Sequence, residues 1–310
     1  MPPQRNEPRD RYLYGIGEWY GRSFITLSGD ERRHFAQIQF LHKRDRPVMP
    51  CLPRCSTGID VPCTKEGGVC SIRQYCQNAA GQVNAAEGKL GFFTTTCPYR
   101  FYERNMVFRW IGETILGSAT PYIVNQVKFL EREGSAVGRI DHVLIHPDTV
   151  NFSWCALEMQ AVYFSGGKMI DEFRAITEST GEAIPFPVRR RRPDFRSSGP
   201  KRLMPQLQIK VPTLRRWGKK MCVLVDCAFF EQLGRMASEN DLTNSDIAWF
   251  VVNFEEDAAG AHLVRDFVHY TTLERAVEGL TAGLPVSLPV FERRIRSKLE
   301  SLLHGGQPVE

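Results

Sequence analysis

The chain has 310 residues, of which 42% are hydrophobic, and this is enough apolar material for a substantial core. No apolar run reaches transmembrane length and the first ten residues lack a signal-peptide core, so the sequence predicts a soluble, cytoplasmic protein without a membrane partner. The net charge of +5 is mild, and its distribution carries more information than its value.

In chain order, the first chemical signal is the cysteine-rich segment 45–104. It holds six of the nine cysteines: Cys51, Cys55, Cys63, Cys70, Cys76 and Cys97. In a reducing compartment such clustering favours a metal over disulfides, and four thiolates around a metal can replace a hydrophobic core. The segment has no pair of CxxC motifs, so free buried thiols remain the alternative.

A helix is predicted next, over Asn105–Leu116. Met106, Trp110 and Glu113 fall at i, i+4 and i+7 and therefore share one stripe. Glu113 lies at the edge of this stripe, either as a surface glutamate or as a carboxylate delivered to a site. The following segment, Tyr122–Leu130, fits a short helix or a strand.

Residues Arg139–Ala161 predict two strands joined by a polar turn at 146–149. Asp141 lies on the first strand, and Glu158 and Gln160 lie on the second, where residues two apart share a face. If the strands are neighbours, Asp141 joins Glu158. Two carboxylates and an amide form an oxygen-rich site that suits Mg²⁺, although acidic residues are also common on exposed strands.

A strongly basic stretch lies between Arg189 and Lys220. It contains twelve Lys and Arg and one acid, Asp194, which gives +11 and leaves −6 for the rest of the chain. We expect segment 186–220 to contact DNA, because phosphates attract its cations and arginine can read guanine edges. The alternative is a solvated charged loop. The candidate contact residues are Arg189, Arg190, Arg191, Arg192, Asp194, Arg196, Ser197, Ser198, Lys201 and Arg202.

The remaining elements complete an α/β pattern. Apolar runs at 221–225 and 247–254 predict buried strands, and 171–178, 273–283 and 290–303 predict helices, while 185–198 fits a loop. Strands that alternate with helices indicate an α/β fold.

Several short motifs together resemble the NotI-like type II restriction endonucleases. They are Cys63-Thr-Lys65, Gly68-Val-Cys70, Cys97-Pro-Tyr-Arg100, and Glu158-Met-Gln160 with the turn that follows it. The resemblance is scattered over most of the chain. It implies a PD-(D/E)xK nuclease fold, with a mixed sheet flanked by helices, in one domain over 1–310. Within it, 105–303 would form the catalytic core around the embedded segment 45–104.

The resemblance also implies roles for individual residues. Asp141 and Glu158 would hold Mg²⁺, Gln160 would orient the attacking water, and Glu113 would assist. The structural metal would be bound by Cys63, Cys70, Cys97 and either Cys51 or Cys55, with a slight preference for Cys51. Four thiolates generally indicate zinc, while the family indicates iron.

One departure concerns charge. The wider fold usually has lysine where Gln160 stands, and a neutral amide can hold a water but cannot supply positive charge to the transition state.

The expected function is therefore that of a type II restriction endonuclease, which makes sequence-specific double-strand breaks at a GC-rich palindrome as a homodimer. One rival is a non-catalytic DNA-binding regulator with a structural four-cysteine metal, although such a protein does not need Asp141, Glu158 and Gln160. Another rival is a non-specific or repair nuclease of the same fold.

Overall fold

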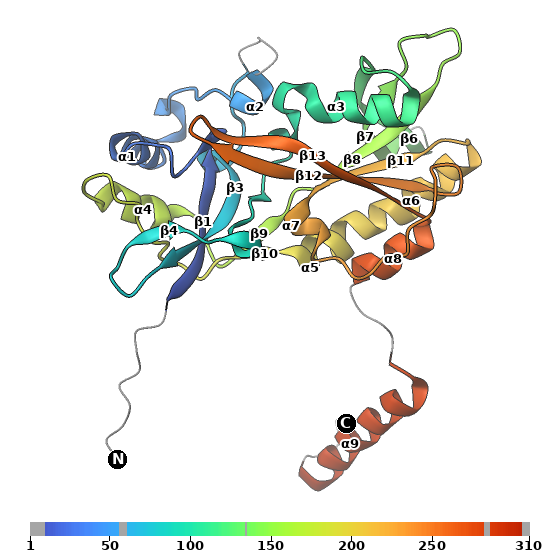
Figure 1. Cartoon of the computed structure of the whole chain (residues 1–310). Coiled ribbons are helices and arrows are strands. Elements are labelled where there is room, and N and C mark those ends of the chain that lie inside the picture. The colour runs from blue at the N-terminus through green and yellow to red at the C-terminus, as the bar shows by residue number, and fades with distance from the viewer. Residues whose placement is uncertain (1–9, 56–60, 134, 282–285, 306–310) are drawn as a thin grey trace.

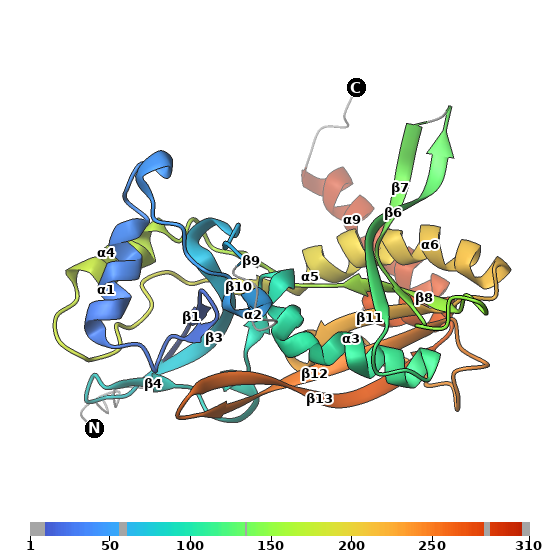
Figure 2. The ribbon, with the colours of Figure 1, turned by 90° about the horizontal axis from the view of Figure 1, so that it is seen from above.

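The computed structural model describes residues 10–55, 61–133, 135–281 and 286–305. Two main sheets organise the protein into two lobes, which Figure 1 and Figure 2 show side by side. The first lobe is built largely from the N-terminal part of the chain together with helix α4. The second contains the predicted catalytic hairpin and most of the later elements.

The first lobe is built on a five-stranded sheet in the order β2-β1-β3-β4, with β5 also paired to β3. Helices α1 and α4 pack against each other beside it. Helix α1 begins at a capping box in which Ser28 and Glu31 satisfy each other's backbone N–H groups. The elements are β1 Arg11–Trp19, β2 Arg22–Ser23, β3 Val69–Gln77, β4 Val83–Ala85, β5 Thr94–Thr95, α1 Gly29–Ile38 and α4 Ile170–Glu178.

The cysteine-rich segment shares the core of this lobe. Val69, Ile72 and Tyr75 on β3 are buried in one cluster with Trp19 and Phe35, which come from the N-terminal 40 residues. The sequence argument that segment 45–104 needs a metal because it lacks a core of its own is therefore incomplete. Strand β3 obtains its hydrophobic partners from β1 and α1, so a metal would add to a core that already exists.

The second lobe is built on a six-stranded mixed sheet in the order β13-β12-β11-β8-β7-β6. Strands β8, β11 and β12 are parallel, and the other pairings are antiparallel. All six residues of β11 are buried, as expected for a parallel strand covered on both faces. The strands are β6 Tyr122–Arg132, β7 Ser135–Ile145, β8 Trp154–Met159, β11 Met221–Asp226, β12 Ile247–Asp257 and β13 Gly260–Thr271.

Helices cover both faces of this sheet. Helix α3 (Met106–Ile111) and the π-helix η5 (Gly112–Leu116) pack on one face around Leu144, Leu157 and Phe250. Helices α6 (Met204–Arg216) and α8 (Leu273–Thr281) pack on the other face. Figure 1 shows α3 above the sheet and α6 and α8 below it.

Shorter elements connect these parts. A two-stranded sheet of β9 (Tyr163–Ser165) and β10 (Arg192–Asp194) lies just beyond β8, and helix α9 (Leu288–Gly305) follows the body of the chain and stands apart from it (Figure 1). The others are η1 Lys43–Asp45, α2 Leu52–Cys55, η2 Glu66–Gly68, η3 Gly88–Gly91, η4 Pro98–Asn105, α5 Phe195–Ser198, η6 Gly199–Leu203 and α7 Cys227–Phe230.

The structure confirms the α/β class and most of the predicted elements. The predicted hairpin is present as β7 and β8, although its connection spans eight residues rather than four, because β7 ends at Ile145 and β8 begins at Trp154. The segment that fitted a helix or a strand is strand β6. The predicted loop at 185–198 is wrong at its end, where β10 pairs with β9 and α5 begins.

Candidate active site

The two predicted catalytic carboxylates meet on neighbouring strands. In the antiparallel pairing of β7 and β8, His142 stands opposite Leu157, so the next pair along is Asp141 and Glu158. Their side chains point to the face covered by α6, as those of Val143 and Ala156 do two residues away. The structure therefore brings these two carboxylates together, while their catalytic role stays a prediction.

The site is buried at Glu158 and more open at Asp141. Burial raises the pKa of Glu158 to about 7, the positive charge of Lys210 opposes this shift, and the carboxylate of Asp141 adds to it. Asp141 accepts a hydrogen bond of 3.0 Å from Gln126 Nε2 on β6. Two interacting carboxylates, one of them buried, are a costly arrangement that a bound cation would relieve.

Lys210 completes this cluster, and the sequence analysis did not identify it. Its Nζ donates hydrogen bonds to Glu158 and, at 2.7 Å, to Gln206 Oε1 one turn earlier on α6. A weak signal was present in the sequence, since Lys210 interrupts an apolar helix between Leu207 and Val211. Periodicity alone does not show which strand such a helix covers.

Gln160 lies directly after the end of β8 and is buried, with its backbone N–H bonded to Leu224 O of β11. It is two residues beyond Glu158 in the sequence and one residue beyond the last residue of the strand. The amide Nε2 donates to the carbonyl of Ala161 at 2.5 Å. Its predicted role in orienting a water stays a prediction.

Glu113 is not brought to the carboxylate pair. It forms an ion pair of 2.5 Å with Arg265, and both side chains are partly exposed. Its neighbours Ile115 and Leu116 pack on the α3 face, whereas Asp141 and Glu158 face α6. The helical pattern that singled out Glu113 was real, but α3 covers the opposite face of the sheet.

Four of the six clustered cysteines share one neighbourhood. Burial raises the pKa of Cys51, Cys63 and Cys70, and the nearby Cys97 raises each of the three further. The backbone joins the same segments, because the amide of Cys97 donates to the carbonyl of Cys70 at 3.1 Å. Among the described residues, however, no three His, Cys, Asp or Glu side chains stand in an arrangement ready to hold a metal ion.

Two cysteines stand outside this group. The thiol of Cys55 contacts the backbone of Val61, and Cys76 lies six residues from Cys70 on β3, about 20 Å along an extended strand. The geometry thus favours Cys51 over Cys55 as a partner of the other three.

The basic segment divides into internal and exposed side chains. Arg191 is buried and bonded to Glu172 on α4 and to the carbonyl of Lys168, and Arg189 pairs with Asp171 at 2.8 Å. Asp194 accepts from the amide of Ser197, and Ser198 is buried between Asp194 and Tyr163. The structure leaves exposed the side chains of Arg189, Arg190, Arg192, Arg196, Lys201 and Arg202.

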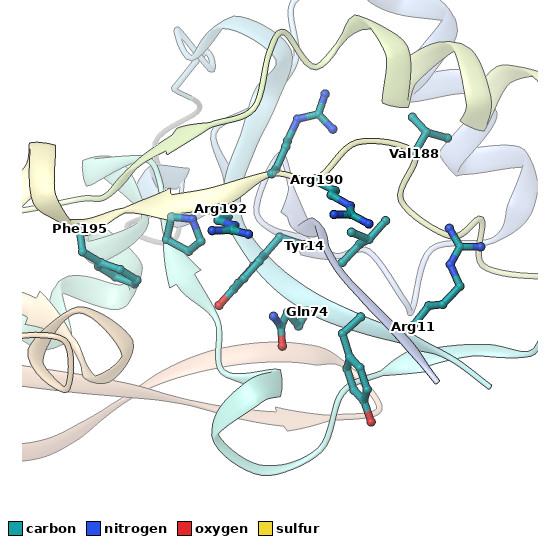
Figure 3. A pocket seen from close by; sticks show the side chains of 11 residues that line it. Arg11, Tyr14, Gln74, Val188, Arg190, Arg192 and Phe195 are labelled. Carbon is teal, nitrogen blue, oxygen red and sulfur yellow. The ribbon is translucent and has the colours of Figure 1, made fainter. Parts of the chain in front are cut away.

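Two of these arginines line a hollow that the sequence did not predict. Arg190 and Arg192 face Arg11, Tyr14 and Gln74 of the first lobe across a cavity of about 670 Å³ (Figure 3). The hollow combines cations with aromatic rings, which is the chemistry of nucleic-acid contact. Its two walls are far apart in the sequence, so no local motif could have revealed it.

Comparison with known proteins places these residues in one family. The family model described as restriction endonuclease NotI matches residues 37–264, which include the cysteine group, both carboxylates and the basic segment. A search of curated proteins finds no match to the chain. None of the helices in the described ranges combines the length and apolar content that crossing a bilayer requires. Because the match spans most of the sequence, the chain belongs to the NotI restriction endonuclease family.

Proposed function

We propose that this protein is a cytoplasmic, magnesium-dependent type II restriction endonuclease of the PD-(D/E)xK fold that makes double-strand breaks at a GC-rich palindrome. The observation that carries the proposal is the meeting of Asp141 and the buried Glu158 on the neighbouring strands β7 and β8. A protein that only binds DNA gains nothing from two carboxylates that repel each other.

The residues present fit a magnesium ion. Mg²⁺ is commonly held by one or two carboxylates together with substrate phosphate and water, so Asp141 and Glu158 suffice as its protein ligands. When bound, it would polarise the phosphate and lower the pKa of water. Gln126 keeps the Asp141 carboxylate oriented. Gln160 follows Glu158 by two residues, and we propose that its amide holds the attacking water.

The reaction adds one water across a phosphodiester bond. The hydroxyl joins phosphorus, the P–O bond to the leaving oxygen breaks, and that oxygen takes up the proton. No covalent enzyme intermediate is needed, so the protein's task is to hold charge and orient groups.

Digestion of a plasmid with Mg²⁺, followed by sequencing of the ends, tests this function. Discrete fragments with one sequence at every end are expected. A smear would indicate a non-specific nuclease, and intact plasmid that is nevertheless bound by the protein would indicate a regulator.

The exposed arginines of the hollow should contribute to DNA binding. Arg190→Ala and Arg192→Ala are each expected to weaken DNA binding for all DNA sequences. Each should also reduce the slope of log K against log salt concentration by about one, as loss of a phosphate contact does. Binding titrations at several salt concentrations measure both effects.

Arg191→Ala is the matched comparison within the same run of arginines. It removes the cation from the buried carboxylate of Glu172, so the free energy of unfolding should fall by about 3 kcal/mol or more. A loss of affinity in Arg191→Ala at unchanged stability, with no effect at Arg190 or Arg192, would contradict this division of roles.

We further propose a twofold homodimer on DNA, because a protein with one carboxylate pair per chain most simply cuts both strands of a palindrome as a symmetric pair. Helix α9 offers a surface for it. Leu288, Phe291, Ile295 and Leu299 form an apolar stripe along α9, and each is at least half exposed (67%, 53%, 50% and 51%).

Sedimentation with cognate DNA in Ca²⁺ is expected to show two chains per site, and Ile295→Glu should shift the free protein toward monomer. A complex of one chain that still breaks both strands in one encounter would rule the dimer out.

A further inference from the structure

Lys210 occupies a position at which a lysine is unusual. Its side chain is only 7% exposed, on the face of α6 that packs against the sheet through Leu207, Val211 and Leu214. Lysine is almost never fully buried unless it is paired, because its ammonium group loses strong hydration. An apolar side chain would fill this position at a lower cost.

Two other buried ion pairs in the described part of the chain differ from this one. Arg100, paired with Glu18, also bonds the carbonyl of Ala261, and Arg191 also bonds the carbonyl of Lys168. Both arginines thereby tie distant backbone segments together. The hydrogen bonds that the structure shows for Lys210 Nζ lead instead to two side chains, Glu158 and Gln206.

The charge of the cluster also differs from that of the Arg191–Glu172 pair, although Arg100 likewise faces two carboxylates, those of Glu18 and Glu103. Glu158 interacts with Asp141 as well as with Lys210, so two carboxylates stand against one ammonium group. With all three ionised, the cluster carries −1, whereas the Arg191–Glu172 pair is neutral. A divalent cation would bring the cluster to +1, which suits a negatively charged phosphate.

We propose that Lys210 is the cationic residue of this active site, where it positions the Glu158 carboxylate and supplies the positive charge that Gln160 lacks. The inference rests on the proposed nuclease function. Lysine is a compact point charge on a flexible stem, and charge held in a buried site stabilises a developing phosphoryl anion more strongly than it would in water. Helix α6, which lies between β8 and β11 in the sequence, delivers this charge from outside the catalytic strand.

The test compares Lys210→Gln with Lys210→Arg. Glutamine keeps a hydrogen-bond donor beside Glu158 but removes the charge, and arginine keeps the charge. With enzyme in excess over DNA, single-turnover cleavage in Mg²⁺ should slow by about 100-fold or more in Lys210→Gln. Lys210→Arg should recover at least a tenth of the wild-type rate. The DNA affinity of both variants in Ca²⁺ should stay within roughly threefold of the wild-type value, because Lys210 is buried and lies apart from the exposed arginines.

A measurement without metal separates the ion pair from packing. Lys210→Gln leaves Glu158 without its cation, so the Tm of the metal-free protein should fall, and adding Glu158→Gln should restore most of it, because the double variant buries no unpaired charge. The control is Lys89→Gln, which breaks an exposed Lys–Glu pair with Glu231 and should change neither Tm nor cleavage.

The outcomes separate the two proposals. If the wild-type protein cleaves DNA and Lys210→Gln cleaves it at the same rate, the proposed role of Lys210 is overturned and the nuclease function stands. If Lys210→Gln and Lys210→Arg lose cleavage rate and Tm equally, Lys210 has a packing role, and its proposed catalytic role is overturned as well. Wild-type protein that cleaves no DNA would remove both proposals.

Discussion

Replacement of either carboxylate of the β7–β8 pair should abolish DNA cleavage while DNA binding persists. Asp141→Ala or Glu158→Ala removes one of two proposed protein ligands of the catalytic cation, and the rate should fall by about a thousandfold or more. The exposed arginines of the hollow lie on other elements, so affinity in Ca²⁺ should remain measurable. Single-turnover cleavage and a binding titration on the same preparation report both quantities.

The structure also indicates which substitution is cleaner at each position. Glu158→Ala strands the buried ammonium group of Lys210, which costs about 3 kcal/mol or more, so loss of activity could reflect loss of fold. Glu158→Gln keeps an oxygen that can accept from Lys210, and Asp141→Asn keeps one for Gln126. Both variants should be inactive. Asp141→Asn should keep a near wild-type Tm, and Glu158→Gln should lose less stability than Glu158→Ala, because Lys210 keeps an acceptor.

Asp148→Ala is the matched control for this experiment. It removes a carboxylate from the same hairpin, in the exposed connection where Asp148 bonds Asn151. It should cleave at the wild-type rate. Cleavage at a near wild-type rate by Asp141→Asn or Glu158→Gln would refute the assignment of the active site.

The part of this site that the sequence predicted is the part governed by local rules. Asp141 and Glu158 lie on strands joined by one short connection, and alternation decides which face each side chain takes. Lys210 is 52 residues from Glu158, and its place depends on how α6 crosses the sheet. No pattern within the helix specifies that crossing.

The arginine run shows the same limit. The sequence gives no reason to distinguish Arg190, Arg191 and Arg192. In the structure, however, Arg191 is buried and paired with Glu172, while its two neighbours are exposed. The carboxylate that distinguishes them comes from α4, about 20 residues earlier in the chain. A count of charges therefore identified the basic segment, but of the ten residues assigned as DNA contacts the structure leaves six exposed.

Glu113 shows a different limit of the sequence. Its helix was predicted correctly, and its place on the apolar edge is real, but the face of the sheet that a helix covers is a property of the topology. The ion pair with Arg265 balances the charge of the Glu113 carboxylate, so Glu113 needs no contact with Asp141 and Glu158. Its proposed catalytic role stays a prediction without a contact to support it.

We expect the second large effect at the cysteine group, where Cys51, Cys63, Cys70 and Cys97 are proposed to bind one iron or zinc ion per chain. Burial raises the pKa of Cys97, and the positive charges of Lys65 and Arg54 oppose this rise, so cations that suit thiolate ligands lie near the group. Thiolates are the form that binds such metals.

Serine at any of these four positions should release the metal and lower the free energy of unfolding by about 4 kcal/mol or more, in the range expected when a structural metal is lost. The loss should stop short of complete unfolding, because β3 keeps its hydrophobic partners on β1 and α1. Elemental analysis of the purified protein and thermal unfolding with and without a chelator measure the two effects.

Cys55→Ser and Cys76→Ser are the matched controls from the same segment. Cys55 contacts the Val61 backbone, and Cys76 lies at the far end of β3 beside Tyr12, so neither should change the metal content. Protein that carries no stoichiometric iron or zinc would refute the site. Loss of metal in Cys76→Ser but not in Cys70→Ser would show that a metal is bound by a different set of thiolates, and would require β3 to present its opposite end to the metal.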